Sequence, residues 1–179
     1  MDYFKELEAS LLSETFWDIT LPHNLETTSP NSPAFNIFLA AQINLNYNSL
    51  FMHGTMISDL LEISGDIHHI FPKAFLKKNG VDTKGKYNQI ANFTMLDTQV
   101  NKAISDDAPS EYFAKVKKQC QTKCAIIGNI TDPDRLVENL RQNAIPENIA
   151  DMSINDYDTF LIERRQLMAK IIEYYYKKL

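Results

Sequence analysis

The segment DIHHIFPK, at residues 66–73, interrupts a chain that is otherwise patterned for helices. The segment at residues 66–71 is short, contains β-branched residues and is bounded by Ser-Gly-Asp on one side and Pro72 on the other, a pattern that predicts a strand ending at the proline. Neighbouring residues of a strand point to opposite faces. His68 and His69 should therefore face different surroundings, and both cannot lie in one buried apolar layer.

The residues that follow predict a loop, a second strand and a helix. The expected elements are a short helix at 72–80, a polar loop at 81–92, a strand at 93–96 and a helix from residue 97 or 98 to about 105. Pro72 suits the first turn of the short helix and Gly80 suits its end. Asp97 or Thr98 can cap the later helix. The order around the histidines is therefore strand, loop, strand and helix.

Helical patterns occupy both flanks of this central segment. Helices are expected at 2–13, 34–44, 57–63, 108–123, 131–143 and 153–178, with a proline- and serine-rich connector at 21–33. The last helix opens with a capping-box-like pair, Ser153 and Asp156. These patterns predict an α+β fold that is predominantly helical, with two short antiparallel strands and a helix embedded in a helical domain.

Charge is unevenly distributed along the chain. The net charge of −5 by itself argues against a nucleic-acid partner, because phosphate binding is driven by Lys and Arg. Between His69 and Lys102, however, six lysines accompany two acids, so this stretch carries +4 and the rest of the chain carries −9. A basic patch on an acidic body is typical of a site for a polyanion, although a solvated lysine-rich loop would have the same composition.

Composition and hydropathy are those of a globular protein. The chain has 44% hydrophobic and 23% charged residues, and no apolar stretch is long enough to span a bilayer. The N-terminal stretch MDYFKELEASLL is acidic and amphipathic, and it lacks the basic-then-apolar order of a signal peptide. We therefore expect a cytoplasmic protein with no membrane partner.

Histidines beside a lysine-rich loop suit the hydrolysis of a phosphodiester. This reaction needs a base that deprotonates water and a cation that stabilises charge on the phosphate and the leaving oxygen. A neutral imidazole near pH 7 can be the base, and a divalent ion held by nitrogen or oxygen ligands can be the cation. Each of the histidines, Asn92 and Asn101 could equally be a structural residue when taken alone.

Taken together, these residues resemble the motif of HNH endonucleases, also called ββα-metal or His-Me finger nucleases. His68-His69 is followed by Asn92 before the second strand and by Asn101 on the next helix, and the nine-residue spacing of the two asparagines agrees with the motif. The resemblance implies that His69 is the general base, that His68 and Asn101 are metal ligands, and that Asn92 braces the catalytic loop. It also implies a ββα-metal finger at about residues 66–105.

The similarity extends over most of the chain. The stretches PAFNIFLAAQ, DIHHIFPKAFLKK, IANFTMLDTQVNK, APSEYF and FLIERRQLMAKII resemble the C-terminal nuclease region of GmrSD-type restriction proteins. The resemblance implies an N-terminal helix and connector at 1–33 and an HNH nuclease domain at 34–179, with a C-terminal helical subdomain at 109–179. In such proteins a nucleotide-dependent domain resembling the ParB/sulfiredoxin fold precedes this region, so a partner domain or subunit of that kind is expected.

The function implied by the resemblance is that of a metal-dependent DNA endonuclease, a phosphodiester hydrolase serving restriction or defence against phage. One divalent ion is expected. His68 stands where many HNH enzymes have a carboxylate, so the site should hold Mg²⁺ less firmly than Mn²⁺, Ni²⁺ or Zn²⁺. Lys73 and Lys102 flank the expected site and are candidates for contacts with DNA, although either can be a solvated lysine.

Two other classes of protein remain open. A nucleic-acid-binding or interaction module could keep the finger fold without cleaving DNA, and the acidic body of the chain slightly favours this alternative. In the third interpretation, the chain is a helical scaffold in which the histidines are merely packed.

Overall fold

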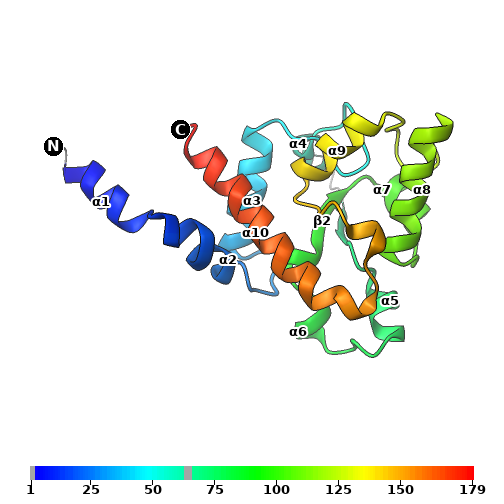
Figure 1. The fold of residues 1–179 in the computed structure, drawn as a ribbon, viewed down its shortest axis with the longest axis horizontal. Helices are drawn as coiled ribbons and strands as arrows, with labels where there is room; N and C mark the ends of the chain where they lie inside the picture. Colours follow the sequence, from blue (N-terminus) through cyan, green and yellow to red (C-terminus); the bar gives the residue numbers. More distant parts are fainter. Residues whose placement is uncertain (1–2, 63–65) are drawn as a thin grey trace.

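The computed structural model describes residues 3–62 and 66–179 and is predominantly helical, with a small antiparallel sheet (Figure 1). This confirms the predicted mainly helical fold with two short strands. Residues 1–2 and 63–65 lie outside the described residues. They include the start of the first expected helix, the end of the helix expected at 57–63, and the Ser-Gly pair before the first strand.

The helices fall into three groups along the chain. Those before the sheet are α1 (Tyr3–Leu11), the π-helical turn η1 (Phe16–Thr20), α2 (Leu21–Asn24), α3 (Pro33–Asn44) and α4 (Ile57–Glu62). Those between the strands are α5 (Lys73–Lys78), α6 (Lys84–Tyr87) and the 3-10 turn η2 (Ile90–Asn92). Those after the sheet are α7 (Thr98–Ile104), α8 (Pro109–Thr122), α9 (Pro133–Gln142), the 3-10 turns η3 (Ile149–Asp151) and η4 (Ile154–Asp156), and α10 (Tyr157–Tyr176).

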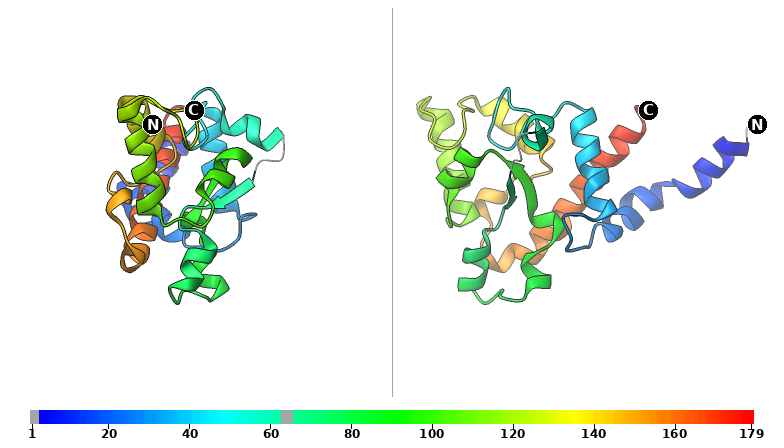
Figure 2. Two further views of the ribbon diagram at one scale, coloured as in Figure 1. Left: turned by 90° about the vertical axis from the view of Figure 1, so that its right-hand side faces the viewer. Right: turned by 180° about the vertical axis from the view of Figure 1, so that it is seen from behind.

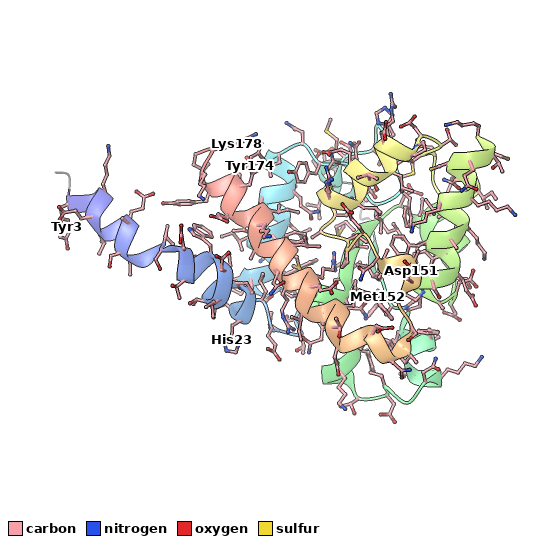
Figure 3. All side chains as sticks on the ribbon, in the orientation of Figure 1. Tyr3, His23, Asp151, Met152, Tyr174 and Lys178 are labelled. Atoms are coloured by element: carbon pink, nitrogen blue, oxygen red, sulfur yellow. The ribbon has the colours of Figure 1, made fainter. Side chains whose placement is uncertain are left out.

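The long helix α10 runs diagonally across the molecule and carries much of the core (Figure 1). It packs against α3 and α2, and its Phe160 and Met168 are fully buried. Trp17 and Leu25, from the segment before residue 34, belong to the same hydrophobic core. Helix α1 projects away from the body, with Tyr3 at its far end (Figure 3).

The sheet consists of β1 (Asp66–His69) and β2 (Phe93–Leu96). The strands pair in the register Asp66 with Leu96, Ile67 with Met95, His68 with Thr94 and His69 with Phe93. The prediction that the first strand runs to residue 71 is wrong, because the ladder ends at His69. Beyond His69, the backbone N–H and C=O groups of Phe71 form hydrogen bonds with the side chain of Asn92. These two groups are therefore not available for a further strand pair.

Two segments expected to lack regular structure contain short helices. The connector predicted at 21–33 begins with α2, and the loop predicted at 81–92 contains α6 and η2. These helices have only three or four residues each, which is too short to produce a hydrophobic period in the sequence. Pro22 fits the first turn of α2, where its missing N–H has no helical partner to lose.

The predicted helix caps near the sheet and before α10 are confirmed. The Asp97 carboxylate accepts a hydrogen bond from the backbone N–H of Gln99 at the start of α7. Ser153 and Asp156 form the expected capping box, but it caps the 3-10 turn η4, and α10 begins at Tyr157 rather than at the predicted Ser153. Among the helices within 3–62 and 66–179, we find none with the length and apolarity needed to cross a membrane.

Candidate active site

A pocket of about 480 Å³ lies where β1 meets α5 and the end of α7. We call it the histidine pocket; it is lined by Ile67, His68, His69, Pro72, Lys73, Ala74, Lys77, Asn101, Ser105 and Asp106. Four of the six predicted site residues therefore come together. The other two do not line the pocket: Asn92 is fully buried behind it, and Lys102 is exposed on α7. Both histidines border the pocket although they are neighbours on one strand.

His69 is partly buried and held by the loop between the strands. Its Nε2 lies 2.9 Å from Oδ1 of Asn88. The edge of its ring packs against Phe93, with the ring centroids 5.0 Å apart and the planes at 85°. Burial lowers the pKa of His69, the hydrogen bond that Asn88 accepts from the ring opposes this, and the charge of Lys73 lowers the pKa further. The imidazole is therefore neutral near pH 7, as a general base must be.

His68 is 6% exposed, and its Nε2 has no hydrogen-bond partner within the described part of the chain. Burial lowers its pKa to about 4, a shift that hydrogen bonding by Asn101 opposes and the charge of His69 reinforces. A buried imidazole nitrogen without a partner is energetically unfavourable. A neutral imidazole with a free nitrogen is also the form that binds a metal ion.

Few groups near His68 could act as ligands for a divalent ion. Within residues 3–62 and 66–179, we find no group of three or more His, Cys, Asp or Glu side chains that could hold an ion. The available donors are the Nε2 of His68 and the amide oxygen of Asn101, with the carboxylate of Asp106 also at the pocket. An imidazole and an amide favour borderline ions over Mg²⁺.

The side chain of Asn92 forms hydrogen bonds with the backbone that follows β1. It accepts a hydrogen bond from the backbone N–H of Phe71 at 2.8 Å and donates to the carbonyl oxygens of Phe71 at 3.1 Å and Tyr87 at 3.3 Å. The backbone N–H of Ile70 donates to the carbonyl oxygen of Asn92 at 2.9 Å. Asn92 therefore joins the end of β1 to the loop that carries Asn88.

Arg164, on α10, forms hydrogen bonds with the backbone on both sides of Asn92. It is fully buried, and its Nη1 donates to the carbonyl oxygens of Ala91 at 2.8 Å and Phe93 at 2.7 Å, on either side of Asn92. Its Nη2 donates to the carbonyl oxygen of Asn143 at 3.2 Å. Burial lowers the pKa of Arg164 to about 9, so the guanidinium stays charged at neutral pH, and its hydrogen bonds to three carbonyl oxygens offset part of the cost of burying that charge.

Sequence reasoning missed several residues at or behind the pocket. Asn88 bonds to His69, Lys77 and Asp106 line the pocket, and Arg164 supports the loop. Asn88 lies four residues before Asn92 in a polar loop, where an asparagine is unremarkable. The lysine count of the central segment already included Lys77, so its charge was a usable signal.

A second, larger pocket of about 610 Å³ lies between α9 and α10. Its lining includes apolar residues such as Leu167 and Ile171 with charged side chains around them, but no histidine and none of the predicted site residues. The histidine pocket is therefore the better candidate for catalysis, since it holds the groups with the lowered imidazole pKa values.

Comparison with known proteins adds no assignment. A scan against protein-family models gives no match. Searches of curated proteins and of solved structures give no match either. The resemblance to HNH enzymes, the ββα-metal finger and the roles of the individual residues therefore remain predictions, to be judged on the geometry of the histidine pocket and on experiment.

Proposed function

We propose that this chain is a metal-dependent DNA endonuclease in which His69 is the general base. The observation that carries the proposal is the hydrogen bond between Nε2 of His69 and Oδ1 of Asn88, at a pocket that also contains His68 and Lys73. A carbonyl oxygen can only accept, so Nε2 carries the proton and Nδ1 is the basic nitrogen. This is the orientation by a neighbouring group that a catalytic imidazole requires.

The proposed reaction uses Nδ1 of His69 to remove a proton from water. The oxygen of that water attacks the phosphorus in line, the bond from phosphorus to the 3′ oxygen breaks, and the departing oxygen takes up a proton from solvent. The products are a 5′-phosphate and a 3′-hydroxyl. Lys73, which lines the pocket and lowers the pKa of His69, offers its ammonium group to a non-bridging phosphate oxygen.

His68 and Asn101 are proposed to hold a divalent ion. Support comes from the unpaired, buried Nε2 of His68, from its lowered pKa and from the position of Asn101 in the lining of the same pocket. A bound divalent ion would stabilise the charge that develops on the phosphate and the departing oxygen. We expect Mn²⁺, Ni²⁺ or Zn²⁺ to be held more firmly than Mg²⁺, because one nitrogen and one amide oxygen form the donor set.

Asn92 is proposed to position the catalytic histidine without taking part in the reaction itself. It does not line the pocket, but its three hydrogen bonds hold Phe71 and Tyr87, which lie on the two segments that carry His69 and Asn88. A base must lie within hydrogen-bond reach of the water it activates, so a small displacement of either segment lowers the rate.

The cellular setting rests on the sequence alone. The role in restriction or defence against phage and the nucleotide-dependent partner domain resembling the ParB/sulfiredoxin fold are implied by the resemblance, whereas the cytoplasmic location is the expectation from composition and from the acidic N-terminal stretch. Such a partner is compatible with the acidic body of the chain, since a net charge of −5 gives weak attraction to DNA outside the lysine-rich stretch.

The direct test is to incubate the purified chain with supercoiled plasmid and Mg²⁺, Mn²⁺, Ni²⁺ or Zn²⁺, with EDTA as the control. We expect nicked and linear products that depend on the metal and disappear with EDTA. Plasmid that is retarded but intact with every metal would favour the non-cleaving binding module. Neither cleavage nor retardation would favour the helical scaffold.

A further inference from the structure

The two rims of the histidine pocket differ in charge. On one side, α5 contributes Lys73 and Lys77. On the other side, the residues that follow α7 contribute Ser105 and Asp106, with Asp107 next in the chain. Asp107 forms an ion pair with Lys115, whereas Asp106 forms none within the described ranges. A phosphodiester chain is therefore attracted to the α5 side and repelled from the α7 side.

The positive charge continues from α5 onto α6. We define the basic lobe as residues 73–88, which lie at one end of the molecule and include both helices (Figures 1 and 2). It contains one acidic residue, Asp82, and five lysines: Lys73, Lys77, Lys78, Lys84 and Lys86. All five lysines are exposed, and none forms an ion pair in the part of the chain that the structure describes. Their charge is therefore free for an external anion.

Two of these lysines converge beside the pocket. The Nζ atoms of Lys73 and Lys77 lie 5.2 and 5.5 Å from the centroid of the Tyr87 ring, which is 7% exposed and so fixed in place. Attraction to the ring face offsets part of the repulsion between the two ammonium groups. A phosphate at this position would neutralise both. Lys77 is therefore as well placed as Lys73 to contact the substrate, although of these two lysines the sequence analysis predicted only Lys73.

We infer that the basic lobe holds the sugar-phosphate backbone of DNA on one side of the bond to be cleaved. This inference rests on the proposed DNA substrate and names the surface that binds it. Lys77 is the contact next to Lys73, and Lys84 and Lys86 meet phosphates farther from the pocket. Lys102 belongs to the helix that leads into the acidic rim, so it contributes little to binding.

The test is fluorescence anisotropy with a labelled DNA duplex and the intact chain, in EDTA so that binding is measured without cleavage. Lys84→Gln with Lys86→Gln is compared with Lys117→Gln with Lys118→Gln, two exposed lysines of α8 whose loss changes the net charge equally. Lys77→Gln is compared with Lys102→Gln. Each lysine that contacts a phosphate should contribute about fivefold in affinity at about 0.15 M salt and about 0.9 to the slope of log affinity against log salt.

We expect Lys77→Gln and the α6 pair to weaken binding and flatten the salt dependence, while Lys102→Gln and the α8 pair stay near wild type. Equal effects of the lobe and control variants, or no binding of DNA by the unmodified chain, would overturn the inference. Tighter binding of an RNA duplex of the same sequence would contradict DNA as the occupant. Binding that depends on the lobe without any metal-dependent cleavage would leave the inference standing and refute the endonuclease.

Discussion

Nε2 of His69 and Oδ1 of Asn88 lie 2.9 Å apart, which ties the first strand to the loop that precedes the second. The contact fixes the ring in orientation and keeps the proton on Nε2, so that Nδ1 is the nitrogen that can accept a proton. Asn88 is itself held in place through its neighbour Tyr87, because the side chain of Asn92 donates a hydrogen bond to the carbonyl oxygen of Tyr87. The position of the base thus depends on two asparagines four residues apart.

Replacing Asn88 should shift the pH dependence of cleavage. The hydrogen bond that Asn88 accepts from Nε2 raises the pKa of His69. The base is active when neutral, so activity rises with pH through that pKa. Asn88→Asp adds a negative charge, raises the pKa and should move the acid limb of the kcat/KM profile to higher pH. Asn88→Ala should move it to lower pH and reduce the rate at every pH. Asn44→Asp, an exposed residue of α3, is the control and should leave the profile unchanged.

His68 should make the fold sensitive to acid. Its pKa is about 4 in the folded chain, whereas the unfolded chain has the ordinary value of 6.5. Between these two pH values the unfolded chain therefore binds more protons than the folded chain. Above pH 6.5, His68 is neutral in both the folded and the unfolded chain and does not lower the free energy of unfolding. As the pH falls toward 4, the unfolded chain takes up a proton at this residue, and the free energy of unfolding decreases by up to about 3 kcal/mol.

The measurement for His68 is urea unfolding in EDTA at a pH above 6.5 and at a pH near 4.5. His68→Gln cannot be protonated, so its stability should fall less than that of the unmodified chain over the same interval. Carboxylates also titrate in this window, but they do so in both proteins, and the comparison removes their contribution. An equal fall in the two proteins would show that His68 is not the buried neutral group described here.

Much of the local structure near the site could be predicted from sequence because it depends on neighbours in the chain. The strand at 93–96, the Asp97 cap and the capping box at Ser153 follow from short-range patterns and are confirmed. The partner of His69 could not be predicted, because a loop asparagine carries no signal of what it will meet in space. Arg164 was also hidden, since it lies in an amphipathic helix where an arginine usually faces solvent.

Removing Arg164 should destabilise the fold strongly. Arg164→Met would leave the carbonyl oxygens of Ala91, Phe93 and Asn143 buried without a donor, at a loss of about 3 kcal/mol or more in the free energy of unfolding. Arg141→Met is the control at an exposed arginine. Arg141 lies 3.5 Å from Glu147, an exposed ion pair that contributes within about 1 kcal/mol. Similar losses for both variants, measured by chemical denaturation, would contradict this role of Arg164.

The central claim is that His69 is the base of a nuclease, and plasmid nicking by His69→Ala tests it most directly. His53→Ala, at an exposed turn histidine outside the pocket, is the control. With Mn²⁺ present, we predict that His69→Ala loses cleavage by a factor of about 10² to 10⁴, the range for removal of a general base, while DNA binding and His53→Ala stay near wild type. Full cleavage by His69→Ala would contradict the account.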